Sequence, residues 1–388
     1  MPRAEPVREF TPEPNTLELR AEEYLKRWAP SGSPEPEPLT SEAREEIRSL
    51  ERRVVGWAFA AGVVSGGLIG GLELFVRREL MNGAEGMDWQ AQAPYWAGFF
   101  VVAGLISAVE IGFLYWNALR AVGKLARTGR VGLQGGGYPE LVGRGLARAA
   151  LEFPNPGTRV FGVDPYARVP TWRLTLKNLL YKTKVGVSSF ILRVSLRRVV
   201  GRMAVRGLIP LLAAPLYAIW NAFITWKLLE AARIRALAPL AMEDRVRAVE
   251  EEELGSEAAG ILLDGVAELT IRAMDAHPNY VYLVGRLLEA LDMEEVREVD
   301  WSASRERLGT LEVRERDVVL DTLVVAALLA GRMRDAQVEF LEEAHQAADL
   351  PFRGEPLSTL RSQMKAGQRL ATEDLRSVRE TPEDPASG

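Results

Sequence analysis

Two long apolar runs constrain this chain more than any other feature. Residues 54–76 read VVGWAFAAGVVSGGLIGGLELFV, and their 23 positions hold one charged side chain, Glu73. Residues 95–119 read YWAGFFVVAGLISAVEIGFLYWNAL and hold only Glu110. A helix as long as the first run spans about 34 Å, which exceeds the roughly 30 Å hydrocarbon core of a bilayer. We therefore expect two transmembrane helices rather than two buried helices of a soluble protein.

The flanks of these runs predict their arrangement. Only residues 77–94 separate them, so the two helices should be antiparallel neighbours. Aromatic residues typical of the membrane–water interface stand at both ends of the second run (Tyr95, Trp96, Tyr115 and Trp116). Basic residues precede the first run and follow the second (Arg52, Arg53, Arg120, Lys124, Arg127 and Arg130). Because such residues stay in the cytoplasm, we expect a multi-pass protein of the bacterial inner membrane with most of the chain cytoplasmic.

Glycines recur at intervals of four in the first run. Gly62, Gly66 and Gly70 form one ladder, and Gly67 and Gly71 form a second. Small residues at this spacing let transmembrane helices approach closely, because no side chain separates their backbones. The first ladder is therefore predicted to be a helix-packing surface, and the hairpin an element that forms homo-oligomers.

The net charge of −5 hides a strong asymmetry. Residues 120–206 hold 17 Lys and Arg against 3 Asp and Glu, whereas residues 243–388 hold 17 against 32. Such a division indicates different surroundings for the two parts. The basic part suits anionic headgroups or nucleic acid, and the acidic part suits water.

Within the basic part, residues 171–206 alternate apolar and basic positions at helical spacing. A basic amphipathic helix of this kind lies on anionic membrane surfaces. Its nearness to the two apolar runs favours headgroups over nucleic acid, so no nucleic-acid partner is expected. The predicted lipid contacts are Arg173, Lys177, Lys182, Lys184, Arg193, Arg197, Arg198 and Arg202.

A third apolar run, residues 208–226, contains Pro210 and Pro215. One interpretation is a third span, which would place the acidic remainder outside the cell. The other is a helical hairpin or dip that enters and leaves the membrane on one side. Basic residues on both flanks favour the second interpretation.

The remaining patterns predict an all-α chain, because no run has the period of a strand. We expect a disordered N-terminal tail at 1–40 with a short helix near 16–28, and the hairpin at 41–130. A membrane-associated basic region at 131–240, an acidic helical domain at 241–372 and a disordered tail at 373–388 follow. Inside the acidic domain, residues 301–313 resemble a strand or loop.

Residues 321–350 read DTLVVAALLAGRMRDAQVEFLEEAHQAADL and resemble the TerB-like (tellurite-resistance) helical domain. The positions that match its motif are Ala330, Gly331 and Met333 at the turn, Glu339 on the next helix and Leu350 at the close. The motif's aspartate is missing, which argues against the metal binding linked to some members. The resemblance implies a membrane-associated stress-response or signalling complex, and hence a cytosolic protein partner.

A looser likeness connects residues 208–238 to the EcsC-like family of membrane-associated proteins. It rests on Ile209-Pro210, Ala213-Ala214, Asn221 and Ala231-Ala232. The likeness supports the dipping interpretation of the third run and implies no defined chemistry.

Composition limits the chemistry that this chain can perform. It has no cysteine and only two histidines, His277 and His345, so thiolate catalysis is excluded and we predict neither a metal site nor a cofactor. No acid, base and nucleophile can be assembled, and the protein is expected not to be an enzyme. The leading hypothesis is a membrane-anchored scaffold in stress-response signalling.

The two intramembrane carboxylates carry the alternative hypothesis. A charge in hydrocarbon is costly, so Glu73 and Glu110 are candidates for a functional role. Glu110 lies deeper in its run and could bind an ion in an oligomeric channel or an ion-coupled transporter. Equally, it could be hydrogen-bonded in a helix interface, with Glu73 reaching the membrane surface.

Overall fold

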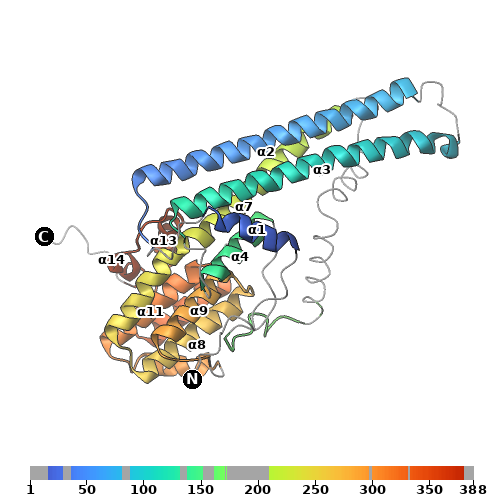
Figure 1. Ribbon diagram of the computed structural model, residues 1–388. Helices are drawn as coiled ribbons and strands as arrows, with labels where there is room; N and C mark the ends of the chain where they lie inside the picture. The colour runs from blue at the N-terminus through green and yellow to red at the C-terminus, as the bar shows by residue number, and fades with distance from the viewer. Residues whose placement is uncertain are drawn as a thin grey trace, which may run out of the picture.

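The computed structural model describes residues 16–28, 36–80, 88–131, 138–151, 161–170, 172, 209–296, 299–330 and 333–379. The regular secondary structure of these residues is helical, with no strand, which confirms the predicted all-α class. Three long helices lie side by side and project from a body of shorter helices (Figure 1).

The long helices are α2 (Ser41–Phe75), α3 (Trp89–Thr128) and α7 (Ile209–Glu252), and a π-helical turn, η1 (Val76–Leu80), continues α2. Thr40 caps α2, where its Oγ1 accepts a hydrogen bond from the Ala43 amide at 3.2 Å. This bond satisfies a donor that a helix start leaves without a partner. α2 and α3 pack against each other, and each continues past its apolar run toward the body.

The third apolar run belongs to α7, a helix of 44 residues. The helical hairpin predicted within residues 208–226 is wrong, because α7 is continuous from Ile209 to Glu252. Pro215 and Pro239 each remove a backbone donor, yet neither ends the helix. α7 also crosses the predicted domain boundary at residue 240, so one rigid element joins the apolar bundle to the acidic part.

Contacts at three points show that α7 runs antiparallel to α2. Gly62 lies against Ala218, and Gly66 lies against Ala214 one turn farther along. Nearer the body, Arg233 forms an ion pair with Glu51. This register sets Ile209 level with Gly71 and Trp226 level with Val54. The third apolar run therefore occupies the same depth as the first.

The acidic part folds around one hydrophobic core. Its helices are α8 (Ser256–Ala273), α9 (Pro278–Ala290), α10 (Trp301–Leu308), α11 (Val313–Leu328), α12 (Asp335–Ala347), α13 (Glu355–Lys365) and α14 (Thr372–Arg376). Tyr280 and Phe340 are among its largest fully buried side chains. The lower half of α7 packs against this core, which also includes Phe161 and Val163 from the predicted membrane-associated region.

The predicted strand or loop at residues 301–313 is wrong in its first half, where α10 forms. Asp300 caps this helix by accepting a hydrogen bond from the Ala303 amide at 3.1 Å. Ser304 then donates to Asp264 of α8 at 2.5 Å. α10 is short and lacks a regular apolar period, so its sequence carries little helical signal.

Both predicted tails contain structure. At the N-terminus, α1 (Thr16–Lys26) forms where a short helix was expected, and its Leu25 is fully buried against α3 and α4 (Tyr138–Ala150). At the C-terminus, α14 begins at Thr372, and Val378 is fully buried in the acidic core. The residues described at each end are held by packing, so the disordered tails are predicted too long.

Candidate functional site in the long-helix bundle

Large apolar side chains cover the outside of the three long helices. Val109 is 75% exposed on α3, Trp57 is 61% exposed on α2, and Ile219 is 60% exposed on α7. Two helices, Ser41–Leu80 and Gln90–Thr128, are long and apolar enough to cross a membrane. Only 33% and 22% of their most apolar windows are buried, whereas a core helix of a soluble protein would be mostly buried.

Three tryptophans, one from each long helix, lie at the same level of the bundle near the body. We call Trp57, Trp116 and Trp226 the tryptophan belt. The hydrogen bond from Asn117 Nδ2 to the Val54 carbonyl, 3.2 Å long, sets the register of α3 on α2. With the α7 register above, the belt residues lie within about one 5.4 Å helical turn of one another. All three indoles are about half exposed or more.

Basic residues stand directly on the body side of this belt. The Arg120 guanidinium lies 5.4 Å from the centre of the Trp116 ring, and the Lys227 amine lies 4.5 Å from that of Trp226. Cations in this position are attracted to the aromatic face. Tryptophan with adjacent Lys or Arg is typical of a membrane–water interface.

A second aromatic and basic level marks the far end of the bundle. Arg77 lies over the Trp96 ring at 5.4 Å and forms an ion pair with Glu73 at 3.0 Å. Arg77 is 20 positions beyond Trp57 in the sequence. At 1.5 Å per residue these positions span about 30 Å, the thickness of a hydrocarbon core. Glu73 thus lies at one edge of the apolar layer, in an ion pair with Arg77.

Glu110 lies in the contact between α3 and α7. Asn221 Nδ2 donates a hydrogen bond of 2.5 Å to Glu110 Oε1, and both side chains are at least 95% buried. By the register of the helices, this polar pair is level with residues 59–61 of α2, nearer the tryptophan belt than the far end. The placement agrees with the helix-interface interpretation of Glu110, and Asn221 was not recognised as its partner from the sequence.

The first glycine ladder faces α7 rather than a second hairpin. A Cβ atom at Gly62 would lie 2.6 Å from the Ala218 Cα, and one at Gly66 would lie 2.6 Å from the Ala214 Cα. Such contacts admit only glycine. Gly70 is also buried. A Cβ atom at Gly67 or Gly71 of the second ladder would meet no atom within 4 Å.

Several predicted residues lie outside the described part of the chain. These are Gly331 and all eight predicted lipid contacts, Arg173, Lys177, Lys182, Lys184, Arg193, Arg197, Arg198 and Arg202. Glu339 is exposed on α12, and Ala330 is buried at the end of α11. The described residues therefore place only part of the TerB-like motif.

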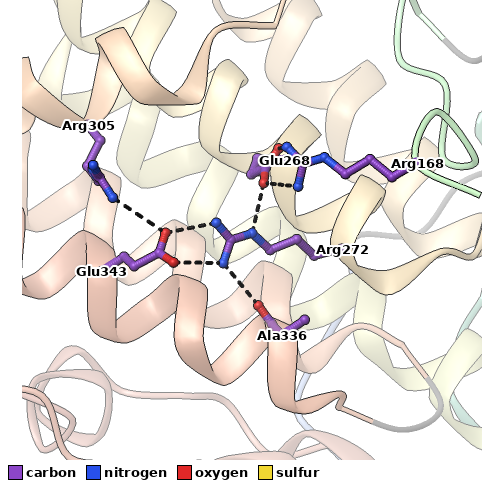
Figure 2. A network of polar contacts seen from close by, with 6 residues as sticks. All are labelled: Arg168, Glu268, Arg272, Arg305, Ala336 and Glu343. Atoms are coloured by element: carbon purple, nitrogen blue, oxygen red, sulfur yellow. Dashed lines mark hydrogen bonds and ion pairs between the residues drawn. The ribbon is translucent and has the colours of Figure 1, made fainter.

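A network of arginines and glutamates in the acidic part was missed by sequence reasoning (Figure 2). Glu268, almost fully buried on α8, accepts hydrogen bonds from Arg168 at 2.7 and 2.9 Å and from Arg272 at 2.8 Å. Arg272 also contacts Glu343 at 2.8 Å and the Ala336 carbonyl at 3.3 Å. The network joins α8 to α12 and to the segment 161–170.

The charges in this network satisfy one another. Burial disfavours the Arg272 guanidinium, but its hydrogen bonds to the Glu343 and Glu268 carboxylates outweigh this effect and raise the pKa of Arg272. Arg305 adds a weaker ion pair to Glu343 at 3.8 Å. The arrangement can hold α8, α10, α12 and the segment 161–170 together.

Both histidines are buried and contact the backbone of their own helices. His277 caps α9, where its Nδ1 accepts a hydrogen bond from the Asn279 amide at 3.3 Å. Burial, with a smaller effect from Arg235, lowers its pKa well below the usual value. His345 lies 2.7 Å from the Leu341 carbonyl, and burial lowers its pKa as well. Within the described residues, no group of three acidic or histidine side chains is arranged to hold a metal ion.

Comparisons of the chain with protein-family models, with curated proteins and with solved structures gave no match. The TerB-like and EcsC-like resemblances therefore rest on the residues quoted for them, and both stay predictions.

Proposed function

We propose that this protein is a non-enzymatic scaffold of the bacterial inner membrane. In this proposal, α2, α3 and the upper part of α7 cross the bilayer, and the acidic helical domain recruits a cytosolic partner in stress-response signalling. The carrying observation is the exposed apolar surface of the bundle, which is bounded by aromatic and basic residues at two levels about 30 Å apart.

The continuity of α7 supports a scaffold that holds its cytosolic part at a fixed place. One helix passes from the level of Gly71 through the tryptophan belt into the acidic core. A rigid connection of this kind keeps the acidic domain close to the membrane surface, whereas a flexible linker would let it move away. The acidic domain lies on the belt side of the apolar layer, which is the cytoplasmic side by its basic residues.

The acidic surface supports recruitment of a protein rather than nucleic acid. Residues 243–388 hold 32 Asp and Glu against 17 Lys and Arg, which would repel a phosphate backbone. The TerB-like resemblance of residues 321–350 points in the same direction. The exposed side of α12, which includes Glu339, is the face to which this proposal assigns the partner.

The alternative of an ion channel or ion-coupled transporter finds less support. Such a function needs Glu110 to face a water-filled path, whereas its carboxylate is buried and bonded to Asn221 in the α3–α7 contact. The pair is better explained as an interhelical hydrogen bond that holds two apolar helices together.

Membrane extraction tests the anchoring part of this proposal. We expect the full-length chain to stay in the membrane pellet after an alkaline carbonate wash and to be released by detergent. Release by carbonate alone would show that the apolar helices do not cross the bilayer. The recruitment part is tested by a photo-cross-linking residue at Glu339, with Arg314 on α11 as the exposed control position. A product formed at Glu339 and absent at Arg314 is expected, and identical products at both positions contradict it.

A further inference from the structure

Three basic residues follow Trp116 along one face of α3. Arg120, Lys124 and Arg127 are spaced at four and three residues, so they lie one above another on the helix. Arg120 and Arg127 are exposed, and Lys124 is half-buried. We call these residues the α3 basic stripe. It starts at the tryptophan belt and runs away from the apolar layer toward the body.

The α3 basic stripe differs from its neighbours because no acidic side chain of the described residues pairs with its charges. Nearby, Arg52 pairs with Glu45, Arg233 with Glu51 and Lys227 with Glu230. Within the described part of the chain, no ion pair joins an acidic side chain to any of the three stripe residues, and the Arg120 guanidinium lies over the Trp116 ring. Unpaired cations in a row have excess positive potential, which an external anion can neutralise.

The depth of the stripe indicates which anion. Along α3, Arg120, Lys124 and Arg127 lie about 6, 12 and 17 Å from the level of Trp116 at 1.5 Å per residue. A headgroup layer extends about 5–8 Å beyond each side of the hydrocarbon core. Arg120 therefore lies within this layer, Lys124 lies about 4 Å beyond it, and Arg127 lies within about one Debye length, 10 Å, of it.

We propose that the α3 basic stripe binds the phosphate headgroups of anionic phospholipids in the cytoplasmic leaflet, with Trp116 inserted beside them. The inference rests on the proposed membrane function and adds to it a lipid class and three binding residues. The positions give an order of importance, in which Arg120 contributes most and Arg127 least. Arg and Lys both bind phosphate oxygens, and Arg does so with two parallel hydrogen bonds.

Lipid binding to the full-length protein in detergent tests this proposal. Native mass spectrometry would measure its binding of phosphatidylglycerol and of phosphatidylcholine. One basic residue near an anionic surface contributes about fivefold in affinity. We expect Arg120→Gln to weaken phosphatidylglycerol binding about fivefold, Lys124→Gln less and Arg127→Gln least, with phosphatidylcholine binding unchanged. The control triple Arg305→Gln, Arg307→Gln and Arg314→Gln removes equal charge from the acidic domain and should change neither.

Two outcomes would overturn the proposal. One is unchanged phosphatidylglycerol binding when all three stripe residues are replaced by glutamine. The other is an equal loss in the control triple, which would indicate a response to net charge alone. Failure of this proposal is distinct from failure of membrane anchoring. A protein that needs detergent for extraction but binds phosphatidylglycerol independently of the stripe residues would still be anchored and would lack only this lipid site.

Discussion

The Asn221 amide donates a 2.5 Å hydrogen bond to the Glu110 carboxylate across the contact between α3 and α7. The two residues are 111 positions apart in the sequence, and both are buried among apolar helices. A polar group buried among apolar side chains without a partner is costly, so each residue compensates the burial of the other. Their hydrogen bond therefore holds α7 against α3 in the bundle.

We expect the Glu110–Asn221 pair to stabilise the bundle by about 1 kcal/mol, the usual size of a side-chain hydrogen bond between membrane helices. A double-mutant cycle with Glu110→Ala and Asn221→Ala, read from unfolding in mixed detergent micelles, would measure this coupling. Strictly additive effects of the two substitutions would show that the pair does not act as a unit.

Adjacent glycines of α2 make a matched pair for testing the α2–α7 contact. A Cβ at Gly66 would lie 2.6 Å from the Ala214 Cα, whereas one at Gly67 would meet no atom within 4 Å. Gly66→Leu should therefore separate the helices and cost about 1–3 kcal/mol or more, as overpacking of a tight contact does. Gly67→Leu should be tolerated. Equal effects on the thermal midpoint of the purified protein would contradict the observed α2–α7 register.

The docking of α1 depends on a buried ion pair. Glu18 lies 2.5 Å from Arg148 of α4, and both side chains are less than 10% exposed. Glu18→Ala leaves Arg148 buried without this partner, a change that costs about 3–5 kcal/mol in comparable cases. We expect α1 to detach and to become sensitive to protease. Glu23→Ala, which breaks only the exposed pair with Arg27 on the same helix, should cost less than about 1 kcal/mol and leave α1 protected.

Acid should destabilise the domain through His277. Its folded-state pKa is lowered by burial and by Arg235, so the unfolded chain binds the proton more readily. The stability contributed by neutral His277 is thus complete above the unfolded pKa of about 6.5 and is lost as pH falls below it, by up to about 1.4 kcal/mol per pH unit. His277→Asn keeps a good helix cap and removes the titration.

Thermal unfolding of the detergent-solubilised protein at pH 7.5 and pH 5.5 would measure this effect. The native chain should lose more stability between these two values than the His277→Asn variant does. An identical loss in both would mean that His277 does not contribute to the pH dependence.

The sequence predicts those features whose causes are local. Long apolar runs such as 54–76 and 95–119 are stable as helices, so the positions of α2 and α3 were predicted correctly except at their ends. Both helices extend beyond these runs, α2 back to Ser41 and α3 on to Thr128. The fold class followed from the same helical periods.

The missed features depend on residues that are distant in the sequence. Gly62 has the spacing of a helix contact, but nothing local shows that Ala218 is its partner. Arg168 reads as one of many basic residues, although it pairs with Glu268 across 100 positions. Flanking arginines around residues 208–226 suggested a turn inside the run, whereas packing against α2 favours one unbroken helix.

Side-specific labelling of single cysteines tests the membrane topology most directly. The native chain has no cysteine, so Glu42→Cys, Asp88→Cys and Glu339→Cys would each report one exposed position. With a membrane-impermeant maleimide, we expect Asp88→Cys at the far end to react in intact cells, and the other two to react only after permeabilisation. Labelling of Asp88→Cys and Glu339→Cys from the same side would contradict a bundle that crosses the membrane with its acidic domain in the cytoplasm.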